Sequence, residues 1–321
     1  MEKFLIIRFS SIGDIILCSP LIRHLKLKYR EAQIDFVTKK QYRFTLEHHP
    51  CIDKLHLLEE NNFDQLKDII KAQEYTAIFD LHHNLRSKKL TFGHSSKVNR
   101  FNKLNIEKWL FTNFKLNYLS KQHIVDRYLA TASLEAHDNK GLDYYHGVNI
   151  KKLLNAYKLD TQPYIIGVIG GSRSTKQLPN WQWVKIASIL ESEKIVLLGD
   201  KQDNIIAQNI KSKNILNLCG KLSFNESAAL CQEAKAVLTN DTGLMHVAAA
   251  YNKPIVSFWG NTSPLFGMYP YNVDQSLLIE NNELSCRPCS KIGYNKCPKG
   301  HFKCMSELNL EPLRDFIDKC V

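Results

Sequence analysis

Residues 236–259 read AVLTNDTGLMHVAAAYNKPIVSFW. The first four residues, Ala236–Thr239, form an apolar run that is typical of a buried strand. A helix of small residues is predicted over Gly243–Tyr251, and a second apolar strand over Pro254–Phe258. A strand, a helix and a strand in this order predict two parallel strands that are joined by a crossover helix. The segment therefore indicates an α/β fold.

The same alternation of strands and helices runs through the chain on both sides of this segment, and it predicts parallel sheets with helices on both faces. The chain becomes polar around residues 151–163, after which a new series of strands begins. We therefore predict two Rossmann-like parallel-sheet domains, residues 1–157 and 158–321. A last helix is predicted over Glu307–Lys319, and it could pack on the C-terminal or on the N-terminal domain. The other predicted strands are Phe4–Ile7, Ile34–Val37, Ala77–Phe79, Tyr164–Ile169 and Lys194–Leu198, and the other predicted helices are Ile12–Leu27 and Asp203–Ile210.

The length and the composition agree with two soluble domains. The chain has 321 residues, of which 44% are hydrophobic and 23% are charged, and this is an ordinary globular composition. No stretch approaches the roughly 18 uninterrupted apolar residues of a membrane-spanning helix. Arg8 and Asp14 interrupt the apolar N-terminus where a signal peptide would have its core. We therefore expect a cytoplasmic protein.

The chain is basic, with 43 Lys and Arg against 32 Asp and Glu and a formal net charge of +11. It contains no recognisable nucleic-acid-binding motif, so nucleic acid is not an expected partner. The surplus of positive charge fits either a well-solvated surface or an acidic partner, such as a phosphorylated substrate or an anionic membrane.

Polar loops follow several predicted strands, at the sheet edge where ligands bind in open α/β folds. The first loop is RFSSIGD, residues 8–14. Its Ser11 and Gly13 open a helix and offer backbone N–H groups to an anion. Asp14 lies in the first turn of that helix, where it either stabilises the helix dipole or accepts a proton from an incoming hydroxyl.

The second loop is GGSRSTK, residues 170–176. Gly171 and Ser172 allow a close approach of the backbone, and Lys176 supplies a positive charge, so the loop suits a diphosphate. It is no P-loop, because the GK ending followed by Ser or Thr is missing, and the chain has no GxGxxG dinucleotide motif. A plain flexible surface loop is the alternative.

The third loop joins the strand and the helix of the opening segment. Thr242 and Gly243 would present N–H groups to phosphate oxygens at the helix N-terminus. Asp241 would accept hydrogen bonds from sugar hydroxyls, and His246 lies four residues after Thr242, on the same side of the helix. The alternative is an Asp cap followed by a structurally satisfied histidine.

Three segments together resemble glycosyltransferase family 9, the heptosyltransferases of lipopolysaccharide core synthesis. They read FLIIRFSSIGDIILCSPLIRHLK, GGSRSTKQLPNW and TNDTGLMHVAAAYNKPIVSFWGNTSPLFGMYPY. The resemblance covers both predicted domains and is weaker between about residues 40 and 150. It implies an α/β fold of the GT-B type, inverting transfer without a required metal or other cofactor, ADP-heptose as the donor and a lipid-linked acidic saccharide as the acceptor.

The resemblance also implies roles for particular residues. Asp14 matches the catalytic base, Lys176 the lysine on the donor diphosphate, and Asp241 the aspartate on the transferred sugar. Gly171 stands where the family has a hydroxyl residue, so that contact would come from the backbone. The implied donor-binding set is Ser11, Gly13, Gly171, Ser172, Lys176, Asp241, Thr242, Gly243, Leu244 and His246.

The acceptor side is less specific in the sequence. The loop DLHHNLRS, residues 80–87, follows a predicted strand of the first domain and matches the family only loosely. His82, His83 and Arg86 are candidates for binding a phosphorylated inner-core sugar, although paired histidines at a strand end are also common as surface residues. The basic net charge fits an enzyme that contacts the anionic inner face of the inner membrane peripherally.

Four of the nine cysteines are close together near the C-terminus: Cys286, Cys289, Cys297 and Cys304. A Cys-x-x-Cys pair followed by two further thiols can supply four tetrahedral ligands to a structural zinc ion. The second pair lacks the close spacing of common zinc motifs, so reduced thiols or a redox-labile pair are the alternative.

Two other functions stay open at this point. A sugar-nucleotide epimerase of the same fold, or a transferase with a different donor, would use similar loops but would differ in its products. A non-catalytic nucleotide-sugar-binding protein would not require Asp14.

Overall fold

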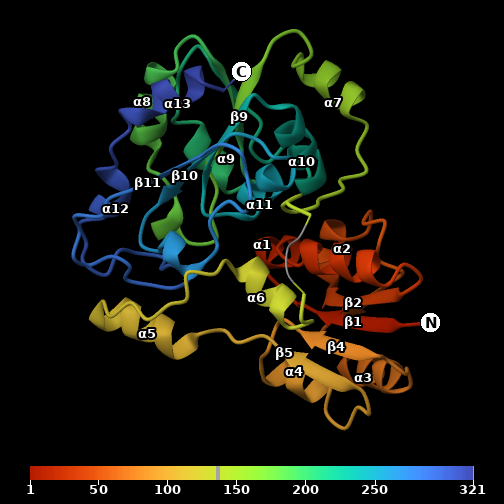
Figure 1. Ribbon diagram of the computed structural model, residues 1–321. Coiled ribbons are helices and arrows are strands. Elements are labelled where there is room, and N and C mark those ends of the chain that lie inside the picture. The colour runs from red at the N-terminus through yellow and green to blue at the C-terminus, as the bar shows by residue number, and fades with distance from the viewer. Residues whose placement is uncertain (135–137, 321) are drawn as a thin grey trace. The chain divides into compact units, whose positions relative to one another are not determined.

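The computed structural model describes residues 1–134 and 138–320. The chain divides into two compact units (Figure 1). Unit 1 comprises Met1–Leu104 and Gln122–His146, and unit 2 comprises Asn105–Lys121 and Gly147–Val321. The functional division at residue 158 stays a prediction. Each unit is built on a parallel sheet with helices, which confirms the predicted fold class.

In the described part of unit 1, five strands form one sheet in the order β3-β2-β1-β4-β5, and all neighbours are parallel. Figure 1 shows α3 and α4 on one face of this sheet and α1, α2 and α6 on the other. The strands are β1 Lys3–Ile7, β2 Gln33–Lys39, β3 Lys54–Leu58, β4 Ala77–Asp80 and β5 Lys97–Arg100, and the helices are α1 Ile12–Ile16, α2 Ser19–Lys28, the 3-10 helix η1 Lys40–Thr45, α3 Phe63–Lys71, α4 Leu85–Leu90 and α6 Ile124–Ala130.

The predicted single helix over Ile12–Leu27 is wrong in one respect, because it is two helices. The first, α1, ends at Ile16, and α2 begins at Ser19 with Pro20 in its first turn. Proline lacks a backbone N–H and is tolerated only where that group needs no helical partner, so a new helix begins there.

The six strands described in unit 2 form a second parallel sheet in the order β11-β10-β9-β6-β7-β8. Figure 1 shows α10 and α11 on the opposite side of this sheet from α8 and α13. The strands are β6 Tyr164–Val168, β7 Lys194–Leu198, β8 Ile215–Asn217, β9 Ala236–Asn240, β10 Ile255–Trp259 and β11 Ser276–Glu280, and the helices are α5 Asn105–Phe114, α7 Ile150–Tyr157, η2 Ser174–Lys176, α8 Asn180–Ile189, α9 Asp203–Ala207, α10 Phe224–Glu233, α11 Gly243–Ala250, η3 Pro264–Phe266, α12 Lys303–Ser306 and α13 Pro312–Asp318.

The last helix packs on unit 2. Leu313 and Ile317 of α13 are buried in one cluster with Trp183 of α8 and with the strand residues Leu238 and Phe258. Apolar burial of this kind is the main favourable term in folding. Among the described residues, no helix combines the length and the apolar character that crossing a bilayer requires.

The two tryptophans of α8 allow a matched test of this core. Trp183 is 1% exposed and its ring packs edge to face on Phe258 at 5.9 Å, whereas Trp181 is 57% exposed. We predict that Trp183→Ala lowers the free energy of unfolding by about 3–5 kcal/mol, because it leaves a large cavity. Trp181→Ala is the control and changes it by less than about 1 kcal/mol. Urea denaturation checks both, and equal effects would contradict this packing.

Candidate functional site

Each sheet has one point where the strand order reverses, and the predicted loops follow the strands at that point. In unit 1, β1 lies between β2 and β4, and in unit 2, β6 lies between β7 and β9. Loops that follow two adjacent parallel strands on opposite sides of such a point leave an open crevice, where ligands bind in this class of fold. The structure thus brings the RFSSIGD loop beside the loop after β4, and GGSRSTK beside Asn-Asp-Thr-Gly.

The first loop holds the Asp14 carboxylate from two sides. Ser11, the residue before α1, donates from its backbone N and from its hydroxyl to Asp14 Oδ2, at 3.1 and 2.8 Å. Arg8 Nη2 lies 2.5 Å from the other oxygen, Asp14 Oδ1. Gly13 is buried within α1. The side chain of Asp14 is 17% exposed, so the carboxylate is held in place but still reaches the surface.

Arg8 connects the first loop to the loop after β4. Its guanidinium donates from Nη1 to the carbonyl of Leu81 at 2.5 Å and from Nε to the carbonyl of Ser10 at 2.8 Å. Burial acts to lower the pKa of Arg8, but the neighbouring Asp14 outweighs it and raises the pKa. Arg8 therefore stays charged and fixes the position of Asp14. Sequence reasoning missed this role, although an arginine that ends an apolar strand is itself an unusual signal.

The pKa of Asp14 is lowered to about 2. Burial acts to raise it, but the charge of Arg8 and the hydrogen bonds from Ser11 stabilise the ionised form more strongly. Asp14 is therefore a carboxylate at neutral pH.

The three predicted acceptor residues lie in different surroundings. His82 packs its ring on Phe9 at 4.7 Å, and burial, together with Arg8, lowers its pKa to about 3, so the ring is neutral beside Asp14. His83 has a positive φ, and its Nδ1 bonds the carbonyl of Phe101 at 2.7 Å. Arg86 is exposed, with its guanidinium over the ring of Phe63 at 5.5 Å. Of the three, only His82 lies against the residues that surround Asp14.

Tyr128 of α6 is a further residue of this site that sequence reasoning did not identify. It is fully buried, and the Arg8 guanidinium lies 6.0 Å from its ring centre. Its hydroxyl has no hydrogen-bond partner within residues 1–134 and 138–320. Burial, followed by the charge of Asp14, raises its pKa, so the hydroxyl keeps its proton.

In unit 2, an ion pair joins the second and third loops. Lys176 Nζ lies 2.5 Å from Asp241 Oδ2, and both side chains are largely buried, with 12% and 13% exposed. The hydroxyl of Thr262, in the loop after β10, also donates to Asp241 Oδ2 at 3.4 Å. The two residues assigned to the diphosphate and to the transferred sugar are therefore in direct contact.

Asn240, the last residue of β9, holds the second loop in position. Its buried amide nitrogen lies within 3.0–3.3 Å of the carbonyls of Val168, Ile169 and Gly170, and its oxygen accepts from the backbone N of Leu178 at 3.2 Å. One side chain thereby binds the start and the end of the GGSRSTK loop to the third loop. Sequence reasoning treated Asn240 only as part of the strand end.

The small residues of the second loop have different environments. A Cβ on Gly170 would collide with a carboxylate oxygen of Asp203, so a larger residue there would displace that buried side chain. Gly171 accepts from the side-chain amide of Gln177 at 3.1 Å, and Ser172 is exposed.

The third loop starts α11 with its polar groups at the sheet edge. Thr242 precedes the helix, and its hydroxyl lies 3.2 Å from that of Thr239. Gly243 is the first helical residue, and Leu244 and His246 of the first turns are buried. The N–H groups of a helix start have no helical partners, so this end of α11 favours an anion.

The four clustered cysteines do not form a metal site in the structure. In the described ranges, no group of three or more His, Cys, Asp or Glu side chains is placed to hold a metal ion. All nine cysteines carry free thiols, and Cys286 Sγ lies 3.8 Å from His301 Nε2. The predicted zinc ion therefore gains no support from the described residues.

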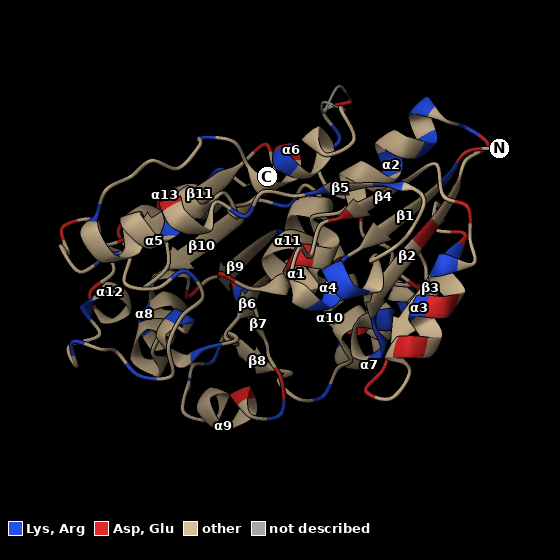
Figure 2. Cartoon of the chain, turned by 90° about the horizontal axis from the view of Figure 1, so that it is seen from below, with Lys and Arg blue, Asp and Glu red and all other residues tan. Residues whose placement is uncertain are grey.

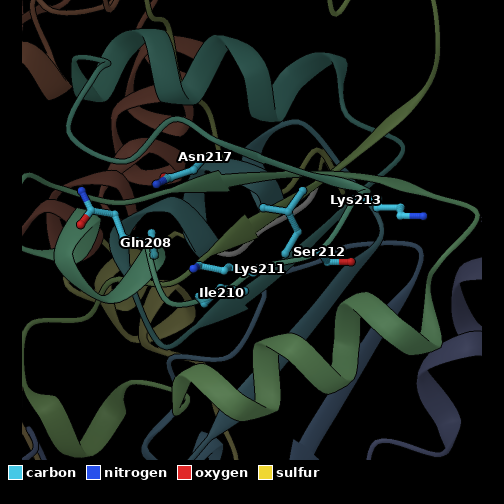
Figure 3. Close-up of a pocket in the computed structure, with 8 residues that line it drawn as sticks. Gln208, Ile210, Lys211, Ser212, Lys213 and Asn217 are labelled. Carbon is cyan, nitrogen blue, oxygen red and sulfur yellow. The ribbon is translucent and has the colours of Figure 1, made fainter.

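A surface hollow of about 540 Å³ lies elsewhere in unit 2, beside the edge strand β8 (Figure 3). None of the predicted site residues lines it. Figure 3 shows Gln208, Lys211 and Asn217 among the side chains around it. Since β8 is at the sheet edge and not at the point where the strand order reverses, this hollow is separate from the donor loops.

The Arg8–Asp14 pair predicts a pH dependence of stability. Because the pKa of Asp14 is lowered from an ordinary value of 3.8 to about 2 in the folded chain, the ionised carboxylate stabilises the fold above about pH 4. That contribution is lost as the pH falls towards 2. We expect the difference in free energy of unfolding between the wild type and Asp14→Asn to shrink by about 2 kcal/mol between pH 5 and pH 2, measured by urea denaturation.

The same pair of measurements in an Arg8→Met background is the control. Without the guanidinium, only the hydrogen bonds from Ser11 still oppose the effect of burial, so the acid-dependent loss should be much smaller. A difference that stays constant with pH in the wild-type background would contradict the role of Arg8.

Known proteins share this architecture. The model of the family described as glycosyltransferase family 9 (heptosyltransferase) matches residues 64–298. The chain is 28% identical over 300 residues to lipooligosaccharide heptosyltransferase 2 of Haemophilus ducreyi, which covers 82% of this chain and 85% of the relative. It resembles the solved structures of ADP-heptose lps heptosyltransferase II and of heptosyltransferase WaaC with ADP, both from E. coli. Their TM-scores are 0.71 and 0.69, at 22% and 18% identity, covering 99% of this chain and 99% and 100% of theirs.

The solved structures show the fold, and they confirm the predicted GT-B type with its two Rossmann-like domains. The family match extends over well more than half of the chain and includes the second and third loops. The chain is therefore a glycosyltransferase and belongs to glycosyltransferase family 9 (heptosyltransferase), as the resemblance of its loops predicted.

Proposed function

We propose that the protein transfers heptose from ADP-heptose to the inner core of lipopolysaccharide, with inversion at the anomeric carbon. The observation that carries this proposal is the contact of Lys176 with Asp241, a cation and a carboxylate together beside the start of α11. Relatives named as heptosyltransferases, and a solved relative that holds ADP, support this choice of donor.

In this proposal the donor is held by unit 2. The diphosphate accepts hydrogen bonds from Lys176 and from the N–H groups of Thr242 and Gly243, with Gly171, Ser172, Leu244 and His246 completing the nucleotide contacts. Asp241 accepts from hydroxyls of the transferred sugar. The positive charge of Lys176 and the helix N-terminus stabilise the nucleoside diphosphate as it leaves, so these residues require no metal ion for that step.

Asp14 is the proposed catalytic base. Its carboxylate takes the proton of the acceptor hydroxyl while that oxygen attacks the anomeric carbon and the bond to ADP breaks on the opposite face. Arg8 and Ser11 hold the carboxylate in position. A carboxylate whose pKa lies near 2 is a weak base, so we infer that the pairing with Arg8 loosens as the proton is taken.

The acceptor is proposed to be a lipid-linked acidic saccharide that meets His82 and the neighbouring residues His83 and Arg86. The enzyme would then be cytoplasmic and would contact the anionic inner face of the inner membrane peripherally. Lys and Arg side chains occur throughout both units, which suits an acidic partner of this kind (Figure 2).

Replacement of the base gives the first test of the reaction. We predict that Asp14→Asn lowers turnover by about two orders of magnitude or more, since the amide cannot accept the proton, while ADP still raises the melting temperature. ADP release is measured with purified enzyme, ADP-heptose and a heptose-deficient lipopolysaccharide acceptor. Release that does not require the acceptor would favour an epimerase or a hydrolase, and near-normal turnover of the variant would exclude Asp14 as the base.

Replacement of the cation gives the second test. We predict that Lys176→Met weakens ADP binding about 10- to 100-fold, because a charge-assisted hydrogen bond to phosphate is lost. Lys185→Met is the control, since Lys185 is an exposed residue of α8. A thermal-shift titration with ADP, UDP and GDP measures the effect. A shift with UDP or GDP alone would keep a transferase but replace the donor.

A further inference from the structure

The helix α5 of unit 2 has an apolar face that is largely exposed in the described part of the chain. Ile106, Trp109 and Phe114 are 73%, 55% and 58% exposed, and no residue of α5 is buried. The segment that follows exposes Leu116 and Tyr118 as well. Large apolar side chains that gather on one exposed face mark an interaction surface more often than scattered ones do.

The spacing of these residues shows that the face is continuous. Ile106, Trp109, Leu110, Asn113 and Phe114 stand at intervals of three, four, seven and eight residues from the first, which places them on one side of a helix. The rings of Trp109 and Phe114 contact each other edge to face at 5.2 Å. In most surface helices this pattern is buried against the protein core, whereas here its large side chains are exposed.

The other side of α5 attaches the helix to unit 2. The ring of Phe111 lies 5.9 Å from that of Phe266, and Lys115 donates to the carbonyls of Cys286 and Pro288 at 3.2 and 2.7 Å. The outward face is therefore held in a defined orientation. The exposure of this face does not arise because α5 lacks contacts with the rest of unit 2.

The charges around this face fit an anionic partner. Within the segment Asn105–Lys121 of unit 2, Lys108 and Lys121 stand against one acidic residue, Glu107, while Lys115 contacts the backbone of unit 2. The chain as a whole carries a formal net charge of +11. Aromatic and aliphatic side chains combined with lysines are the composition of helices that lie in the interface of a bilayer, where the apolar groups enter the acyl boundary and the lysines meet lipid phosphates. A second copy of this basic chain would bring like charges together, so an anionic bilayer is the better complement.

We infer that α5 and the residues up to Tyr118 form a bilayer-docking surface, with Ile106, Trp109 and Phe114 inserted at the level of the headgroups of anionic lipids. The inference rests on the proposed function in that the proposed acceptor is lipid-linked, and it specifies which surface meets the lipid. It assigns no catalytic role to α5.

Vesicle co-sedimentation of the full chain tests the surface directly. Vesicles of equal parts phosphatidylcholine and phosphatidylglycerol should bind the wild type, and pure phosphatidylcholine vesicles should bind it more weakly. We predict that the double variant Trp109→Ser, Phe114→Ser lowers binding to the anionic vesicles about tenfold or more, because two aromatic side chains no longer enter the lipid. The control is Trp181→Ser, Ile205→Ser, which removes two exposed apolar residues of unit 2 outside this face.

Three results would overturn the inference: no binding of the wild type to anionic vesicles, equal binding of the double variant and the wild type, or an equal loss in the control. A change of oligomeric state in the double variant, seen by size-exclusion chromatography with light scattering, would identify a second copy as the occupant instead. The ADP-induced thermal shift separates this inference from the proposed function. The double variant should keep that shift, and a wild type that binds vesicles but no ADP would contradict the proposed donor and leave the docking surface standing.

Discussion

In both sheets of the described chain every strand pairs in parallel with its neighbours, and most other features depend on this constraint. Parallel neighbours need a crossover segment, so helices cover both faces and the loops after the strands collect at one edge. Because the strand order reverses beside β1 and beside β6, two such loops diverge at each of these points. The proposed catalytic and donor-binding residues come from these loops and from the first turns of the helices that follow them.

Two ion pairs at these loops have a common character. Arg8 with Asp14, and Lys176 with Asp241, are close pairs with 10–17% of their side chains exposed. Removal of one partner of such a pair leaves an uncompensated charge, which is strongly destabilising. Each pair therefore holds the side chain of a proposed site residue in position, and in the proposed reaction each must partly give way to substrate.

The buried amide of Asn240 holds the second loop in position. Its four hydrogen bonds tie both ends of the second loop to the end of β9. A buried side chain at the end of β9 thus helps to hold the loop that carries Lys176. The same holds in unit 1, where Arg8 reaches the carbonyl of Leu81 in the neighbouring loop.

The sequence by itself determined the fold class, the main strands and the loops that carry the site, because apolar runs and polar loop residues report local burial and turn chemistry. It did not predict the contacts of Arg8, Asn240 and Tyr128, which join residues far apart in the chain and depend on the order of the strands. It also left α5 unassigned and allowed a zinc site at the cysteines, since spacing alone fixes neither which face of a helix is covered nor whether four thiols meet at one point. Only the tertiary structure decided these, because long-range packing sets the environment of each side chain.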